Sequence, residues 1–330
     1  MRGKGLLRRG KGGIRRHPAL AGREAALLVL IGAALVGLSP LSPQFLVPAN
    51  LLEMSRNGVE VGLLALGMTL VILTGGIDLS VGSIMGLAAV TLGMSWRYGG
   101  LPIEAAAGVA LAVGLGAGLL NGLLMVLLRE RGGAAPALIV TLATLAVYRG
   151  LAYGVSRSRD VHGFPDSFAM LGQGSVLGIL PAPTLLWLLL AALLALVLER
   201  TSLGRGVRAL GANEAAARLS GLPVDGIRFF VYGLSGLLAG LAAVVYVSRV
   251  STAKADTGLG YELAAITVVV LGGTRLTGGQ GSLLGTALGL ALIHIVQYGL
   301  TLAGLKSDRQ AVILSALLIA AVWLDRRREE

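Results

Sequence analysis

Long apolar runs separated by short polar segments are the feature that most limits how this chain can fold. A membrane-spanning helix needs roughly 20 mostly apolar residues, and its backbone polar groups must bond within the segment. The chain of 330 residues contains ten such runs, several of them short or interrupted by glycine, at residues 24–38, 58–75, 79–96, 104–128, 136–153, 183–199, 227–248, 261–273, 282–303 and 310–324. The sequence therefore predicts an all-α, polytopic transmembrane helical bundle of about ten spans.

The run at 261–273 is too short to cross a bilayer alone. At about 1.5 Å per residue it would cover roughly 20 Å of the ~30 Å hydrocarbon core. We therefore expect its helix to extend through Leu259 or beyond Gly273.

Composition supports the membrane interpretation. Hydrophobic residues make up 55% of the chain and charged residues only 14%, whereas an average soluble domain has about 25% charged residues. One soluble domain of this size could not cover its surface with so few charges. The composition excludes a water-soluble enzyme and a disordered protein.

The distribution of Lys and Arg predicts the orientation, because cytoplasmic segments of membrane proteins are enriched in both. With ten spans and an inside N-terminus, 19 of the 28 basic residues fall in inner segments and 9 in outer ones. Both termini are therefore expected in the cytoplasm, and most of the net charge of +11 reflects topology, with no nucleic-acid partner. We expect residues 1–18 to form a basic cytoplasmic tail, and 19–330 a single transmembrane domain with its first helix retained.

Two polar segments are long enough to act outside the bilayer. Residues 154–183 would form an outer loop, and residues 200–226 a cytoplasmic loop. Within the second, Asn213 is placed to cap a two-turn helix over Glu214–Leu219, which Gly221 and Pro223 would end. A helix this short is unstable alone, so we expect it to dock on another surface.

Three segments carry a resemblance to a known family. Residues 66–86 read LGMTLVILTGGIDLSVGSIMG, residues 211–224 read GANEAAARLSGLPV, and residues 262–289 read ELAAITVVVLGGTRLTGGQGSLLGTALG. In this order and spacing they resemble the permease subunits of bacterial ABC importers for ribose-type monosaccharides. The resemblance covers roughly residues 45–325 and implies a multi-pass protein of the bacterial inner (plasma) membrane that imports a monosaccharide or a sugar-like solute.

The resemblance also implies partners. These are two cytoplasmic ATP-binding-cassette ATPase subunits, a periplasmic or extracellular sugar-binding protein, a second permease in a homodimer or heterodimer, and the surrounding lipid. Docking to the ATPase would fall on Gly211, Asn213, Glu214, Ala216, Ala217, Ser220 and Gly221. The chain contains no G-x-x-x-x-G-K-[ST] phosphate loop, so we expect no enzymatic activity and no cofactor of its own, with ATP used by the partner subunits.

Polar residues inside the runs are candidates for the solute path. Thr74, Asp78, Asn121 and Gln297 are the residues we select, because a neutral sugar needs hydrogen-bonding groups and amides both donate and accept. Two interpretations of Asp78 remain open: it caps a helix that starts at Leu79, or it contacts the solute. For the amides the alternative is hydrogen bonding between helices.

A weak internal similarity relates residues 69–86 to residues 267–285, with Asp78 opposite Arg275. Transporters often contain internal repeats with glycine-interrupted helices near the substrate path. If this repeat were inverted, the two glycine-rich loops would lie on opposite faces of the membrane.

Two other classes of function remain as alternatives. An intramembrane serine protease could use Ser235, within Gly233–Gly236, and His294 as its base, although these glycines also favour close helix packing. A proton- or ion-coupled carrier would need a buried relay, for which only Asp78, Glu60, Glu104 and Glu262 are available. No cysteine is present and the three histidines are far apart, so we expect no metal site. Ribose, other pentoses, rhamnose and the autoinducer-2 signal all remain compatible solutes.

Overall fold

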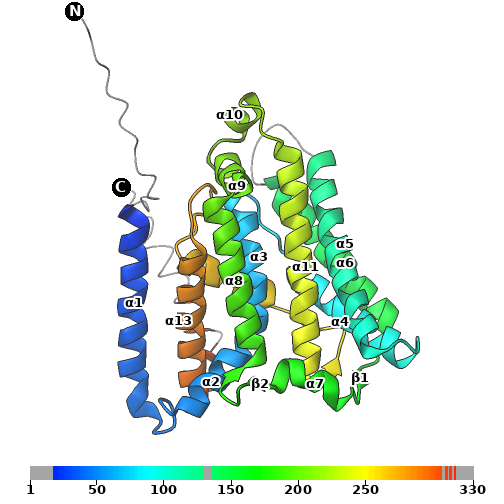
Figure 1. Cartoon of the computed structure of the whole chain (residues 1–330), viewed down its shortest axis with the longest axis vertical. Coiled ribbons are helices and arrows are strands. Elements are labelled where there is room, and N and C mark those ends of the chain that lie inside the picture. Colours follow the sequence, from blue (N-terminus) through cyan, green and yellow to red (C-terminus); the bar gives the residue numbers. More distant parts are fainter. Residues whose placement is uncertain (1–17, 129–134, 307–308, 311, 314–315, 317–330) are drawn as a thin grey trace, which may run out of the picture.

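The computed structural model describes residues 18–128, 135–306, 309, 310, 312, 313 and 316. Long helices lie side by side, and the short strands gather at one end of the bundle (Figure 1). The helices and strands are α1 (Pro18–Leu38), η1 (Ser39–Leu41), α2 (Pro48–Asn57), α3 (Val59–Leu73), α4 (Val81–Arg97), α5 (Ile103–Leu127), α6 (Ala135–Ser156), β1 (Val161–His162), α7 (Asp166–Gln173), β2 (Ser175–Val176), β3 (Leu180–Pro181), α8 (Ala182–Arg200), α9 (Ser202–Ala212), α10 (Glu214–Leu219), α11 (Val224–Val250), β4 (Thr252–Ala253), α12 (Tyr261–Leu271) and α13 (Leu283–Leu302).

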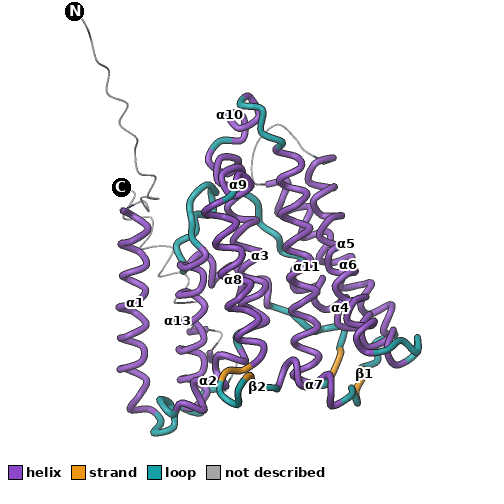
Figure 2. The backbone as a smooth tube through the Cα atoms, viewed as in Figure 1, coloured by secondary structure: helices purple, strands orange, loops and turns teal. Residues whose placement is uncertain are grey.

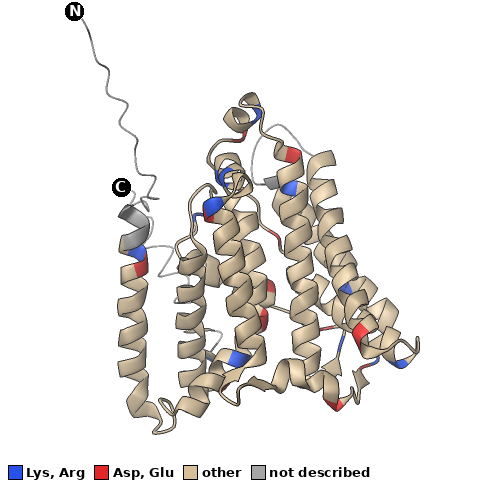
Figure 3. Cartoon of the chain, in the orientation of Figure 1, with Lys and Arg blue, Asp and Glu red and all other residues tan. Residues whose placement is uncertain are grey.

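The chain is an all-α, polytopic membrane protein, as the sequence predicts. Among the described residues six helices are long and apolar enough to cross a membrane: α1, α5, α6, α8, α11 and α13. The consecutive helices α2 and α3 pass the same test together, but they are bent by 49°. Figure 3 shows the middle of α1 and α8 free of charged residues, as expected where a helix faces lipid.

Helices α4 and α12 are shorter than a full span. The expectation that the 261–273 run extends into a longer helix is wrong, because α12 covers only Tyr261–Leu271. Gly260 and Gly273, with φ of 82° and 85°, interrupt the helix at its two ends. The last predicted span, 310–324, and the tail 1–18 fall almost entirely outside the described residues.

A two-residue strand and a series of turns precede the short helix α12 along the bundle. Near the start of α4, a Cβ on Gly82 would overlap Glu262 and Gly258, whereas a Cβ on Gly93 would lie 3.0 Å from Ala253 in β4. These two glycines are 11 residues apart on α4, so the segment from β4 to α12 runs along about 16 Å of that helix. Loop segments, drawn in teal, cross the interior of the bundle between its helices (Figure 2).

Helix α3 is the centre of the packing, since all of its residues from Val59 to Leu73 are buried. Beside it, α5 and α11 approach closely through glycines. A Cβ on Gly118 would lie 2.9 Å from Gly236 Cα, and one on Gly240 would lie 2.8 Å from the Ala110 carbonyl oxygen. The small residues around Ser235 therefore serve helix packing.

The two ends of the bundle differ. One end, here called the α10 end, carries α9 and α10 (Figure 1). The other, the α7 end, carries α7 and two small antiparallel sheets, in which Val161 pairs with Ala253 and Ser175 with Pro181.

Candidate functional site

The candidate site is a cavity of about 690 Å³ between α2, α12 and the second half of α13. We call it the α13 cavity. It is lined by Met54, Asn57, Val61, Tyr261, Ala264, His294, Gln297, Tyr298, Thr301 and Gln310. Amide, phenol, imidazole and hydroxyl groups thus share one cavity with apolar side chains.

Its polar groups lie mainly along one face of α13. His294, Gln297, Tyr298 and Thr301 follow the spacing of 3, 4 and 7 residues that brings side chains to one side of a helix. Gln297 was expected from the sequence, whereas Tyr298 and Thr301 were not. The helical spacing of these polar residues within an apolar run is the signal that would have found them.

A buried ion pair lies next to Asn57 in the wall of the α13 cavity. Arg249 Nε lies 2.7 Å from Oε1 of Glu60, which is almost fully buried, and Arg249 Nη1 donates to Asn57 Oδ1 at 2.8 Å. Gln173, on α7, donates its amide to the Arg249 carbonyl oxygen at 2.8 Å. The pair links the bend between α2 and α3 to the α7 end, and each charge is neutralised by the other.

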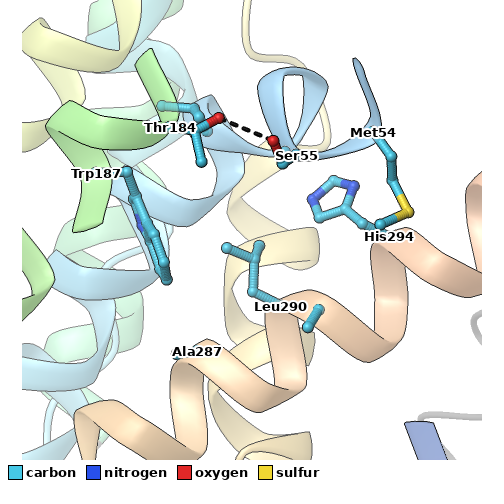
Figure 4. A pocket seen from close by; sticks show the side chains of 10 residues that line it. Met54, Ser55, Thr184, Trp187, Ala287, Leu290 and His294 are labelled. Carbon is cyan, nitrogen blue, oxygen red and sulfur yellow. Dashed lines mark hydrogen bonds between the residues drawn. The ribbon is translucent and has the colours of Figure 1, made fainter. Parts of the chain in front are cut away.

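A smaller pocket of about 150 Å³ lies on the other side of Met54 and His294. Figure 4 shows the His294 ring pointing from α13 into this pocket, with Trp187 across from it. The Ser55 and Thr184 hydroxyls are hydrogen-bonded to each other at 3.0 Å, which links α2 to α8. Met54 and His294 thus line both spaces.

The serine protease hypothesis is wrong, because Ser235 and His294 lie on opposite sides of α3. A Cβ on Gly67 would lie 3.1 Å from Ser235 Oγ, and one on Gly58 would lie 2.9 Å from His294 Nε2. Nine residues separate these glycines, which is about 13.5 Å along the helix and about half a turn around it. A nucleophile and its base must come within hydrogen-bonding distance.

Asp78 belongs to a separate buried network towards the α10 end. Its Oδ1 accepts hydrogen bonds from the Ser80 backbone nitrogen at 3.0 Å and from Ser80 Oγ at 2.7 Å. Asn121 donates to Ser80 Oγ at 2.7 Å and to Asp78 at 3.5 Å, and Tyr148 donates to Asn121 Oδ1 at 3.0 Å. The network joins the loop before α4 to α5 and α6, and α4 begins at Val81, two residues later than expected.

The four residues selected for the solute path do not form one site. Asp78 and Asn121 lie together and are fully buried, and the Thr74 hydroxyl donates to the Val71 carbonyl oxygen within α3. Gln297 alone lines the α13 cavity. For Asn121 the geometry corresponds to hydrogen bonding between helices.

The α10 end presents the short helix predicted in the 200–226 loop. The Asn213 side chain accepts from the Ala216 backbone nitrogen at 3.0 Å, which confirms the predicted cap. Glu214 binds Arg228 at 3.0 Å, and Arg218 binds Asp225 at 3.0 Å. The hydrogen bonds that Arg218 donates to the Asp225 carboxylate raise the pKa of Arg218 and hold α10 against α11.

The end of α9 is packed against two loops. A Cβ on Gly211 would overlap the Leu73 carbonyl oxygen and lie 2.5 Å from the Gly279 nitrogen. A Cβ on Gly278 would in turn lie 2.8 Å from the Gly75 nitrogen. The two glycine-rich loops of the internal similarity therefore meet at one place, on the same face of the bundle.

Within the described part of the chain, no group of three or more His, Asp and Glu residues could hold a metal ion. The four titratable residues considered for a carrier also differ in their surroundings. Glu60 is bound to Arg249, Glu104 is exposed, and Asp78 and Glu262 are buried.

Comparison with known proteins gives consistent matches along the chain. The family model described as "Branched-chain amino acid transport system / permease component" matches residues 50–322. The ribose import permease proteins RbsC of Bacillus subtilis (strain 168) and Escherichia coli (strain K12) are 40% and 39% identical, covering 88% and 92% of this chain and the same shares of their own. The autoinducer 2 import system permease protein LsrD of Enterobacter sp. (strain 638) is 36% identical, covering 91% of each chain.

Proposed function

This chain belongs to the family of branched-chain amino acid transport system permease components, and we propose that the solute it moves is a monosaccharide, which enters through the α13 cavity. The protein is a multi-pass inner-membrane permease subunit of an ATP-binding-cassette importer for a sugar-like solute, not an enzyme with its own ATPase site. What we propose is the identity of the solute, its route through the protein and the surfaces that contact the partner proteins.

The neutral lining of the α13 cavity is the observation that carries the proposal. Gln297, Tyr298 and Thr301 offer donors and acceptors without charge, which suits the hydroxyl groups of a sugar. An amino acid would bring an ammonium and a carboxylate, each of which needs an opposite charge when it leaves water. The nearest pair, Glu60 and Arg249, already neutralises itself.

The α10 end is the proposed docking surface for the ATPase. Leu219, at the last position of α10, is 91% exposed, which is unusual for a leucine at the tip of a charged turn. Burying such a side chain at an interface contributes about 1.5–3 kcal/mol. The residues Gly211, Asn213, Glu214, Ala216, Ala217, Ser220 and Gly221 keep their proposed role as the scaffold of this surface.

The α7 end would then face the periplasm and receive the sugar-binding protein. It carries most of the 154–183 segment, with α7 and both small sheets (Figure 1). We propose that 19–330 acts as one permease domain, preceded by the basic tail, and pairs with a second permease.

Transport by the reconstituted complex tests this function. The permease, its ATPase and its binding protein are placed in proteoliposomes, and uptake of radiolabelled ribose, rhamnose and leucine is measured with ATP inside. We expect ATP-dependent uptake of a sugar and none of leucine. Uptake of leucine alone, or sugar uptake driven by a proton gradient without the ATPase, would overturn the proposal.

A further inference from the structure

The loop that joins α12 to α13, residues 272–282, is bound at several points by elements of the α10 end. On α9, Arg208 Nη1 donates to the Gly281 carbonyl oxygen at 3.0 Å. The Gly279 nitrogen donates to the Leu73 carbonyl oxygen at the end of α3, also at 3.0 Å. On α1, Arg23 donates to the Gly273 carbonyl oxygen at 2.9 Å.

The contact between this loop and α9 has almost no free space. A Cβ on Gly279 would lie 2.9 Å from the Ala212 nitrogen, and one on Gly278 would lie 3.0 Å from Gly211 Cα. The two backbones are thus so close that no Cβ fits between them. We expect them to move together, because packed interiors have few voids and transmit displacement.

The same loop leads directly into the walls of the α13 cavity. Helix α12 contributes Tyr261 and Ala264, and α13 contributes His294, Gln297 and Tyr298. The two helices pack closely, since a Cβ on Gly289 would lie 3.0 Å from the Gly272 nitrogen. Helix α12, the loop and α13 therefore form one hairpin with the cavity at its far end.

Helix α9 is fixed to its neighbours on both sides. Thr201 caps its first turn, accepting from the Gly204 nitrogen at 3.3 Å, and Asn213 both ends α9 and caps α10. Only Asn213 separates α10 from α9, so a displacement of α10 reaches Gly211 and Arg208 within the last two turns of α9.

We propose that Arg208 is a positioning residue that couples α10 to the α12–α13 hairpin, so that movement at the ATPase surface changes the shape of the α13 cavity. This inference rests on the proposed function, since it takes α10 as the ATPase contact and the α13 cavity as the solute site. Arg208 is half-buried, and its side chain hydrogen-bonds α9 to the Gly281 carbonyl oxygen of the hairpin.

The bond suits this role because it joins a fixed helix to a loop carbonyl. A guanidinium carries five N–H donors, so it can stay hydrogen-bonded to the Gly281 carbonyl oxygen while α9 and the loop shift relative to each other. Hydrogen bonds to charged groups are also stronger than neutral ones. Without Arg208, α9 would keep its close backbone contact with Gly278 and Gly279, while the Gly279–Leu73 hydrogen bond would hold the loop to the end of α3.

The test compares Arg208→Met, which keeps the stem and removes the donors, with Arg208→Lys, which restores one donor group. Arg205→Met is the matched control, since Arg205 lies three residues earlier on α9 and is exposed. Each variant is assembled with the ATPase and the binding protein, and ribose uptake, basal ATP hydrolysis and complex stability are measured.

We expect Arg208→Met to lower ribose uptake about tenfold while basal ATP hydrolysis stays within about twofold of the parent. Arg208→Lys should recover part of the uptake, and Arg205→Met should behave as the parent. The proposal would be overturned if Arg208→Met took up ribose at the parental rate. It would also be overturned if ribose uptake, ATP hydrolysis and complex stability all fell in parallel, because that would indicate a general structural defect.

A second measurement does not depend on the solute. The chain has no cysteine, so Ala215→Cys and Thr301→Cys, at exposed positions of α10 and α13, introduce two defined labelling sites. We expect ATP to shift the distance between spin labels at these sites in the parent and not in Arg208→Met. An equal change in the label distance in the parent and in Arg208→Met would overturn the coupling. If the parent showed the change in distance but took up no ribose, only the proposed function would be contradicted.

Discussion

Arg249 and Glu60 form a buried ion pair, with Nε 2.7 Å from Oε1, although 189 residues separate them in the sequence. The pair joins the last turn of α11 to the first turn of α3. It lies next to Asn57, which lines the α13 cavity. It therefore contributes to the shape of that cavity without bringing a net charge to it.

Removing one member of this pair should destabilise the protein. Arg249→Met would leave Glu60 buried and uncompensated, at a cost of about 3–5 kcal/mol. In the double variant with Glu60→Gln most of the loss should be recovered, because neither charge remains. Thermal unfolding in lipid nanodiscs measures this, with Arg159→Met, at an exposed position, as the control. A double variant no more stable than Arg249→Met would contradict the expected compensation.

Gln297→Ala should weaken solute binding. Loss of one hydrogen bond to a neutral ligand costs about 0.5–1.5 kcal/mol, which corresponds to a half-saturating ribose concentration roughly twofold to twelvefold higher. The maximal rate should change less. Gln44→Ala, at an exposed position outside the cavity, provides the matched control in the same uptake assay. An unchanged half-saturation in Gln297→Ala would remove this residue from the path.

Substitutions at Asp78 separate its two interpretations. Asp78→Asn keeps the Oδ1 acceptor for Ser80, whereas Asp78→Ala leaves the Ser80 nitrogen without a partner, at about 1–3 kcal/mol. If Asp78 positions the start of α4, Asp78→Asn should retain uptake and only Asp78→Ala should lose stability. Loss of uptake in a stable Asp78→Asn protein would instead favour a direct role of the charge in the solute path.

Leu219→Ser should weaken the association with the ATPase. Loss of one buried leucine at an interface corresponds to at least about tenfold in affinity. Leu177 is equally exposed, at 91%, but lies at the α7 end between β2 and β3, so Leu177→Ser is the matched control. The amount of ATPase that copurifies with each variant is the measurement. Equal recovery with both variants would place the ATPase contact elsewhere.

Gly211→Ala should be poorly tolerated. Its Cβ would overlap the Leu73 carbonyl oxygen, and backbone cannot yield as a flexible side chain can. Gly116→Ala is the control, because a Cβ at Gly116, within α5, meets nothing within 4 Å and should stabilise the helix by up to about 1 kcal/mol. Unfolding temperatures of both variants test the contrast. A Gly211→Ala protein as stable as Gly116→Ala would contradict the packing described at this junction.

Most of the helices could be predicted from local features. The apolar runs over 104–128, 183–199 and 227–248 agree with α5, α8 and α11 to within three residues at each end. The cap at Asn213 was also predictable, because it depends on residues two or three positions apart. The extension of the 261–273 run was wrongly expected, because its length alone did not indicate that a short strand and turns precede the helix.

The candidate site was only partly predictable. Gln297 was selected for its amide, but its companions Tyr261 and Asn57 come from other helices, and no spacing in the sequence connects them. Asp78 and Asn121 were selected for the same site as Gln297, whereas they bind each other in a separate network. Polarity identifies candidates, but it does not say which of them share a cavity.

By itself the sequence determined that this chain crosses a membrane repeatedly, lacks an ATP-binding loop and is similar to sugar permeases. These properties follow from apolar run length, composition and short motifs, all of which are local along the chain. Only the tertiary structure decided that Glu60 pairs with Arg249, that Arg208 binds the 272–282 loop, and that Ser235 and His294 stay apart. Such pairings depend on how helices distant in sequence pack against one another, and that packing is the result of the whole fold.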